Sequence, residues 1–176
     1  MEKVQIEQKA SELLKNYEEY ISDDSFVDIV GIARAMGFVV GQATLDDNED
    51  GFIIIDNSKD ELLGVKTKKL IVVNKNRDFN LRRFIIAHEI GHYYLECGNS
   101  DKAFASREHK TGKSDKENEI DYFAACLLMP SESFIKKYNE YKEIFNDKII
   151  LTLLLSKQFG VTEKTCERRF EELALN

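Results

Sequence analysis

The sequence is poor in cysteine, with only three residues of this type, Cys97, Cys126 and Cys166. They are an odd number, lie far apart, and form no Cys-x-x-Cys pair. This spacing argues against a disulfide scaffold and against a zinc site built from cysteines. We therefore expect three free thiols in a reducing compartment such as the cytoplasm.

The sequence also lacks long apolar runs and a surplus of positive charge. No run approaches the roughly 18 apolar residues that a membrane-spanning helix needs, and the first residues show no apolar core of a signal peptide. The net charge is −7, whereas binding to nucleic-acid phosphates needs clustered Lys and Arg. We expect a cytoplasmic protein that neither enters a membrane nor binds nucleic acid directly.

The composition is that of a protein with a hydrophobic core. The chain has 176 residues, of which 43% are hydrophobic and 32% charged, and this length favours a single domain over residues 1–176. An amphipathic pattern predicts an N-terminal helix over about residues 1–22, and a helix pair over about 147–176 is expected to belong to the same domain.

Three short β-branched runs are bounded by turn-forming and charged residues. They predict strands at 38–43, 51–56 and 69–74. A long and mostly apolar helix is expected over 79–97, followed by a polar surface loop over 98–116. The predicted fold is α+β, with a small three-stranded sheet packed against a bundle of helices that carries a zincin His-Glu-x-x-His site.

That motif reads His88-Glu89-Ile90-Gly91-His92. Residues four apart lie on one face of a helix, so His88 and His92 can offer two imidazole nitrogens to one metal ion. Glu89 is rotated by about 100° around the axis, where a general base can reach a metal-bound water. The alternative is a chance match, but a buried cluster of this kind is costly without a partner ion.

A catalytic zinc site needs a third protein ligand. Glu117 and Glu119, in the stretch KENEIDYFAAC, both have a suitable side chain. The stretch SDKE predicts a capping box with Ser114 as the cap and Glu117 as its partner, which leaves Glu119 as the expected ligand. Asp121 is either an acceptor for the N–H group of a histidine ligand or a solvent-facing carboxylate.

Two blocks resemble the ImmA/IrrE family of metallopeptidases. They are LIVVNKNRDFNLRRFIIAHEIGHYYLE and ENEIDYFAACLLMP, within a resemblance that covers about residues 26–173. The glutamate of the family's second block is its third metal ligand, and the resemblance implies that Glu119 has this role. Ile120 departs from the pattern, because the family usually has alanine there.

The resemblance implies a cytoplasmic, gluzincin-like peptidase, of a kind often encoded on mobile elements, that cleaves a helix-turn-helix repressor and so derepresses its genes. The expected metal is Zn²⁺, with Mn²⁺ or Fe²⁺ as alternatives. A binding protein with a structural or vestigial metal site, which docks a repressor or toxin partner, is the alternative function. The general base Glu89 favours the enzyme, because a structural site has no use for it.

Two features of the sequence leave their roles open. An oxyanion-stabilising donor is needed for peptide hydrolysis, and Tyr93, Tyr94, Tyr122 and His109 are the candidates by residue type. The final helix pair has the spacing of a helix-turn-helix. Its second helix carries more acidic than basic residues, so we expect it to serve the structure or to dock the substrate rather than to read DNA.

Overall fold

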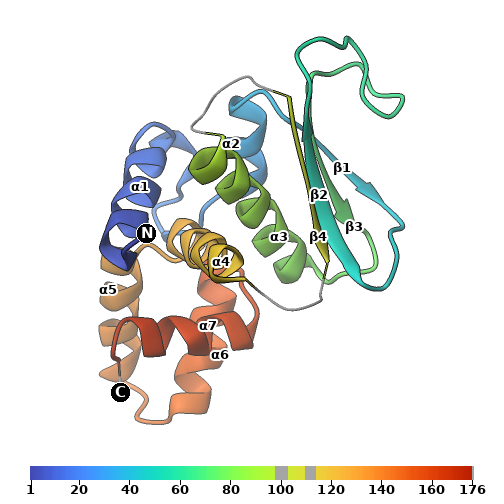
Figure 1. Cartoon of the computed structure of the whole chain (residues 1–176). Helices are drawn as coiled ribbons and strands as arrows, with labels where there is room; N and C mark the ends of the chain where they lie inside the picture. Colours follow the sequence, from blue (N-terminus) through green and yellow to red (C-terminus); the bar gives the residue numbers. More distant parts are fainter. Residues whose placement is uncertain (98–102, 110–113, 176) are drawn as a thin grey trace.

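The computed structural model describes residues 1–97, 103–109 and 114–175, and the side chains of residues 107–109 lie outside this description. Helices and strands form an α+β fold in which a sheet lies at one side of a group of helices (Figure 1). The helices are α1 (Lys3–Lys15), α2 (Ile29–Ala35), α3 (Phe79–Gly91), α4 (Asp115–Leu128), α5 (Ser131–Lys142), α6 (Lys148–Phe159) and α7 (Glu163–Glu172). Short 3₁₀ and π turns cover Glu18–Tyr20 and His92–Glu96.

The sheet has four strands in the order β1-β3-β2-β4. The strands are β1 (Val39–Ala43), β2 (Glu49–Ile55), β3 (Lys69–Asn74) and β4 (Phe104–His109). β1 pairs with β3 in parallel, while the β3–β2 and β2–β4 pairs are antiparallel. β4 therefore lies at one edge of the sheet, with β2 as its neighbour.

Strand alternation gives the sheet two apolar faces. Ile53 and Ile71 are paired across β2 and β3 and belong to the main core, which the helices share. The neighbouring pair, Phe52 and Val72, points to the opposite face and forms a smaller core with Leu62. The period of two along each strand is the physical origin of this division.

The expected three-stranded sheet is wrong by one strand. β4 falls inside the segment 98–116, which its polar composition predicted to be a loop. Pairing with β2 brings Phe104 and Ser106 opposite Ile55 and Ile53, so the strand is fixed by a partner far away in the sequence. The rest of that predicted loop, 98–102 and 110–113, lies outside the described residues.

Helix α3 occupies the centre of the fold. It contacts α2, α4, β2 and β3, and Figure 1 shows it between the sheet and the other helices. Its start is fixed by Asp78, whose side chain accepts a hydrogen bond of 2.9 Å from the backbone N–H of Leu81. The chain remains helical beyond Gly91, but as a wider π turn over His92–Glu96 rather than as the expected regular helix.

Arg83 on α3 ties this helix to two distant segments. Its guanidinium is buried and donates hydrogen bonds to the backbone carbonyls of Val27, Phe159 and Gly160. Burial lowers the pKa of Arg83 to about 10, so the side chain remains charged at neutral pH. Across the described part of the chain, no helix combines the length and the apolar character needed to cross a membrane.

Candidate metal centre

The two histidines of the motif converge because α3 continues into the π turn. Nε2 of His88 and Nε2 of His92 lie 3.0 Å apart, and both side chains are almost completely buried. The i and i+4 spacing places them on one face of the helix. The pair that the sequence predicts is therefore brought together in the structure.

A third donor comes from the first turn of α4. Oε2 of Glu117 lies 3.2 Å from Nε2 of His88 and 3.7 Å from Nε2 of His92. One possible ligand atom from each of these three residues lies within 4.8 Å of the other two. Two imidazoles and one carboxylate form a donor set that suits zinc.

Close packing of α3 on α4 makes this convergence possible. A Cβ atom added to Gly91 would lie only 2.9 Å from Cγ2 of Ile120 and 3.3 Å from the ring of Phe123. Glycine at position 91 thus leaves room for the side chain of Ile120, the residue that departs from the family pattern. The two helices approach each other at the point where their ligands meet.

Glu119, the ligand expected from the sequence, is not brought to the histidines. Its carboxylate pairs instead with the N-terminal ammonium group of Met1. Two residues of α-helix correspond to a rotation of about 200°, so Glu117 and Glu119 point to nearly opposite sides of α4. The side of Glu117 faces α3, and the side of Glu119 faces the start of the chain, where α1 packs on α4.

The expected capping box is half formed, and this explains the difference. Oγ of Ser114 accepts a hydrogen bond of 3.2 Å from the backbone N–H of Glu117, as a cap residue should. The Glu117 carboxylate is at the histidines instead of returning to the backbone of Ser114. The hydrogen bond from His88 lowers the pKa of Glu117, so its carboxylate is charged at neutral pH.

Each histidine is oriented by a second carboxylate through its other ring nitrogen. Nδ1 of His88 lies 3.0 Å from Oδ1 of the buried Asp121, and Nδ1 of His92 lies 2.6 Å from Oε2 of Glu96. A carboxylate at Nδ1 accepts a hydrogen bond from the N–H group there, which places the lone pair of the neutral imidazole on Nε2. Asp121, for which the sequence left two roles open, is thus an acceptor for a motif histidine.

This arrangement fits a bound metal cation. The Nε2 atoms of both histidines and the Glu117 carboxylate face one another, and these electron-rich atoms repel unless a proton or a metal cation lies between them. Burial lowers the pKa of His92, and the neighbouring His88 lowers it further, so the imidazole favours its neutral, ligating form. The donor set and its protonation are those that a divalent metal requires.

Two cations compensate the carboxylates on their outer side. Lys116 forms an ion pair with Glu96, and Nη1 of Arg168 on α7 lies 3.3 Å from Oδ2 of Asp121. Burial alone would raise the pKa of Glu96, but hydrogen bonds from Lys116 and His92 outweigh it, and the pKa is lowered. Sequence reasoning did not identify Glu96, although its spacing of four residues from His92 was a usable signal.

Glu89, the predicted base, is fully buried beside the sheet. A Cβ atom added to Gly51 on β2 would lie 3.7 Å from Oε1 of Glu89 and 2.5 Å from Cγ2 of Ile85. The absence of a side chain at position 51 therefore leaves space for Ile85 and Glu89 of α3. The Glu89 carboxylate lies against β2, and residue 89 is rotated by about 100° from His88 around the helix axis.

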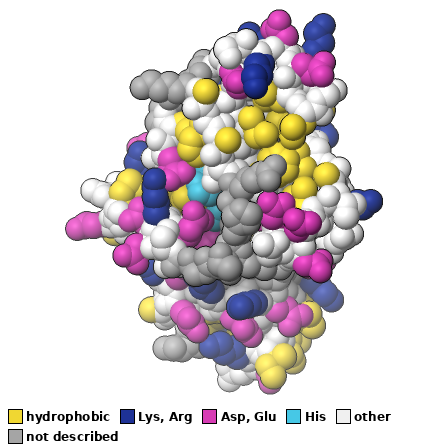
Figure 2. Space-filling model, turned by 45° about the vertical axis from the view of Figure 1, so that its right-hand side comes forward, with side chains coloured by type: hydrophobic (Ala, Val, Ile, Leu, Met, Phe, Trp, Pro, Cys, Tyr) yellow, Lys and Arg dark blue, Asp and Glu magenta, His cyan; other side chains and the backbone are white. Residues whose placement is uncertain are grey.

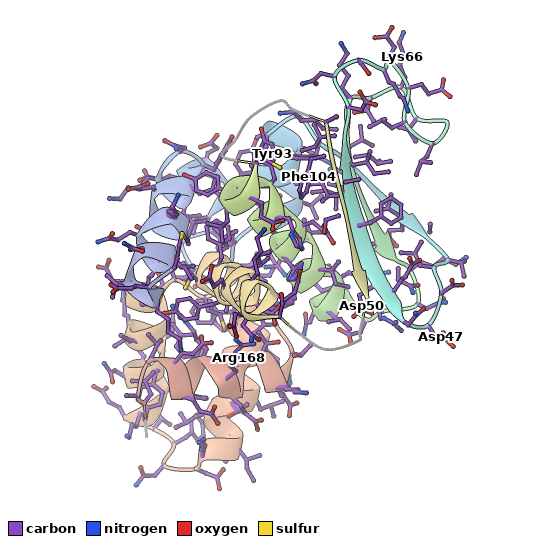
Figure 3. The ribbon with its side chains drawn as sticks, in the orientation of Figure 1. Asp47, Asp50, Lys66, Tyr93, Phe104 and Arg168 are labelled. Carbon is purple, nitrogen blue, oxygen red and sulfur yellow. The ribbon has the colours of Figure 1, made fainter. Side chains whose placement is uncertain are left out.

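The edge strand β4 borders the histidines. Oγ of Ser106 lies 3.5 Å from Nε2 of His92, and the ring of Phe104 is 6.5 Å from the His92 ring. Figure 3 shows Phe104 between the ribbon of α3 and the sheet. In Figure 2, histidine atoms are visible on this face of the molecule, beside acidic side chains.

The tyrosines considered as oxyanion donors make contacts in the core. Tyr93 is buried, and its hydroxyl accepts a hydrogen bond of 3.0 Å from Nζ of Lys69. Tyr94 stacks on Phe123, and burial raises the pKa of the Tyr122 hydroxyl to about 12. The backbone of His109 ends β4, but its side chain is outside the described part of the structure.

Comparison with known proteins agrees with this geometry. The model of one family, Peptidase_M78 or IrrE N-terminal-like domain, matches residues 47–171. The match spans more than half of the chain and includes the motif helix α3, the edge strand β4 and the helix α4. No curated protein matches the sequence.

Proposed function

This chain belongs to the Peptidase_M78 family of IrrE N-terminal-like domains, and we propose that it is a zinc-dependent endopeptidase with His88, His92 and Glu117 as its metal ligands. The convergence of these three side chains within 4.8 Å carries the proposal. When bound, Zn²⁺ lowers the pKa of a water molecule to about 7 and polarises the carbonyl that the water attacks.

Glu89 is the proposed general base. It follows His88 directly on α3, and its carboxyl group is completely buried, where electrostatic interactions are stronger than in water. Glu89 takes a proton from the attacking water and delivers it to the nitrogen of the departing amine. Asp121 and Glu96 hold the imidazoles in one orientation during this transfer, because each accepts a hydrogen bond at Nδ1.

The edge strand β4 supplies a place for an extended polypeptide. An edge strand presents backbone N–H and C=O groups that a bound peptide can pair with, and β4 runs past His92 through Ser106. A substrate segment that is already unfolded or loop-like can adopt this conformation without loss of its own structure. This favours cleavage within a flexible segment of a protein substrate.

For the substrate we propose a helix-turn-helix repressor in the cytoplasm. Support comes from the family, whose resemblance implies this substrate class, and from the proposed peptidase activity. The test is incubation of the purified zinc-loaded protein with repressors encoded beside its gene, followed by mass spectrometry of the products. Binding without cleavage by the wild-type protein would instead favour the non-catalytic docking function.

Metal analysis of two neighbouring glutamates tests the ligand set. We expect one zinc per chain in the wild-type protein and a large loss of zinc in Glu117→Ala after desalting. Glu119→Ala is the matched control on the same helix, and it should retain zinc because its carboxylate faces Met1. Loss of zinc from Glu119→Ala with retention of zinc in Glu117→Ala would overturn the proposed assignment. The same elemental analysis, on wild-type protein purified from cells without added zinc, identifies the native metal.

A further inference from the structure

A cavity of about 230 Å³ opens beside Asp121, and it is not used by the proposed chemistry. Leu81 and Phe84 of α3 and Ala125 of α4 form an apolar wall. The other side is bordered by Thr162, which caps α7, and by Lys164, Thr165 and Arg168 of α7. Leu81 and Phe84 are only partly buried, so these apolar groups remain accessible to a ligand. Figure 3 shows Arg168 in the region between the ribbons of α4 and α7.

The cavity continues the metal centre along the groove between α3 and α4. Leu81, Phe84 and His88 lie on one face of α3, because their spacings of three and four residues match the helical repeat. Asp121 and Ala125 lie four residues apart on α4 and face the same groove. Asp121 borders the cavity and also contacts Nδ1 of His88, so this side chain is common to the cavity and the metal centre.

The size and the lining of the cavity select one kind of ligand. A cavity of about 150 Å³ lined by apolar side chains is large enough for benzene, so this one accommodates a leucine, methionine or phenylalanine side chain. The Arg168 guanidinium on its border is already paired with Asp121 and Glu172. This pairing lowers its attraction for an acidic side chain and favours an apolar occupant.

We propose that this cavity, called here the Leu81–Phe84 pocket, binds a large apolar side chain of the protein substrate and sets the cleavage specificity. Phe84 lies four residues before His88, which is about 6 Å along the helix axis. An extended peptide advances about 3.3 Å per residue, so the bound side chain belongs to a residue within about two positions of the cleaved bond. This inference rests on the proposed peptidase function.

Cleavage-site profiling with pocket variants provides the main test. The zinc-loaded full chain is incubated with a complex peptide mixture, and the cleaved bonds are identified by mass spectrometry. We expect Leu, Met and Phe to be enriched at one position within two residues of the cut. Phe84→Ala should shift this preference towards Trp, and Leu81→Trp towards Ala and Ser, each by about tenfold. Leu153→Ala, an exposed apolar residue on α6, is the control and should leave the profile unchanged.

A binding measurement separates this inference from the proposed function. N-acetyl-leucinamide and N-acetyl-alaninamide are titrated into ¹⁵N-labelled protein, and we expect shifts of the Leu81 and Phe84 amide signals with the leucine compound only. Such shifts without any peptide cleavage would retain the pocket and overturn the peptidase proposal. Cleavage with no apolar preference, or with the same profile in both variants, would overturn the pocket and retain the peptidase.

Discussion

The Oε2 atom of Glu96 lies 2.6 Å from Nδ1 of His92, within the π turn that follows α3. A π turn is a common local feature of functional sites, and here it positions a carboxylate against a proposed metal ligand. The same Glu96 carboxylate pairs with Lys116 at the start of α4. Orientation of His92 therefore depends on a contact between the two helices that carry the site.

Glu96→Ala tests this contact. Loss of the hydrogen bond frees the His92 ring, and we expect zinc affinity to fall by about 10-fold to 100-fold, as for other carboxylates that orient a ligating histidine. Competition with a chromophoric chelator gives the affinity directly. Lys116→Ala leaves the Glu96–His92 hydrogen bond in place, so its loss of affinity should be the smaller one. Unchanged affinity in Glu96→Ala would show that the π turn alone orients the ring.

Glu89→Gln separates catalysis from metal binding. Glutamine has nearly the same shape as glutamate but cannot take up a proton, so we expect a loss of hydrolysis of at least about 100-fold. Zinc content should remain at the wild-type level, because the three proposed ligands are untouched. The measurements are the rate of peptide cleavage and elemental analysis of the same sample. Wild-type cleavage by this variant would remove Glu89 from the role of base.

Gly51→Ala should disturb the site from the side of the sheet. The added Cβ atom would lie 2.5 Å from Cγ2 of Ile85 and 2.9 Å from the carbonyl oxygen of Val72, so the strand or the helix must shift. We expect destabilisation by about 1–3 kcal/mol, typical of overpacking. Chemical denaturation measures this free energy of unfolding. A Cβ atom added to Gly41 on β1 meets nothing within 4 Å, so the control Gly41→Ala should change the stability by less than about 0.5 kcal/mol.

The metal-free protein should lose stability as the pH falls. His92, Glu96 and Glu117 all have lowered pKa values in the folded state, so the unfolded chain binds more protons at acidic pH. The stability that these groups contribute is full at high pH. For His92 it is lost as the pH falls below the ordinary value of 6.5, and for the two glutamates below 4.5.

Thermal unfolding in the presence of a chelator, at a series of pH values from 7.5 to 4, provides the measurement for this acid dependence. His92→Gln should flatten the part of the curve between pH 6.5 and about 5, because that variant lacks the titrating imidazole. A wild-type unfolding temperature that rises on acidification would contradict the assigned directions. The test needs no peptidase activity and no metal.

Some helices and strands can be predicted from local sequence because their own residues determine the secondary structure. The β-branched runs that became β1, β2 and β3 and the apolar motif helix α3 are of this kind. β4 is different, because Phe104–His109 has a mixed, polar composition and becomes a strand only through its pairing with β2. Prediction from periodicity alone had no signal for that partner.

The third proposed ligand shows the same limit at a single residue. A capping box is a local interaction, and it is the correct default for a glutamate at the third position of a helix. Here the Glu117 carboxylate lies beside Nε2 of His88 and Nε2 of His92 on the neighbouring helix instead of returning to the backbone of Ser114. The histidine pair, in contrast, follows from helical geometry within one segment, and the structure brings the two histidines together.

The hydrogen bonds of Arg83 limit how far the chain can be shortened at its C-terminal side. One guanidinium joins the carbonyl of Val27, near the beginning of the chain, to those of Phe159 and Gly160, near its end. A shortened version that stops before α6 would leave a buried positive charge without two of its acceptors, at a cost of several kcal/mol. The last two helices are therefore a poor choice for removal in expression screens, and fusion partners are better attached beyond them.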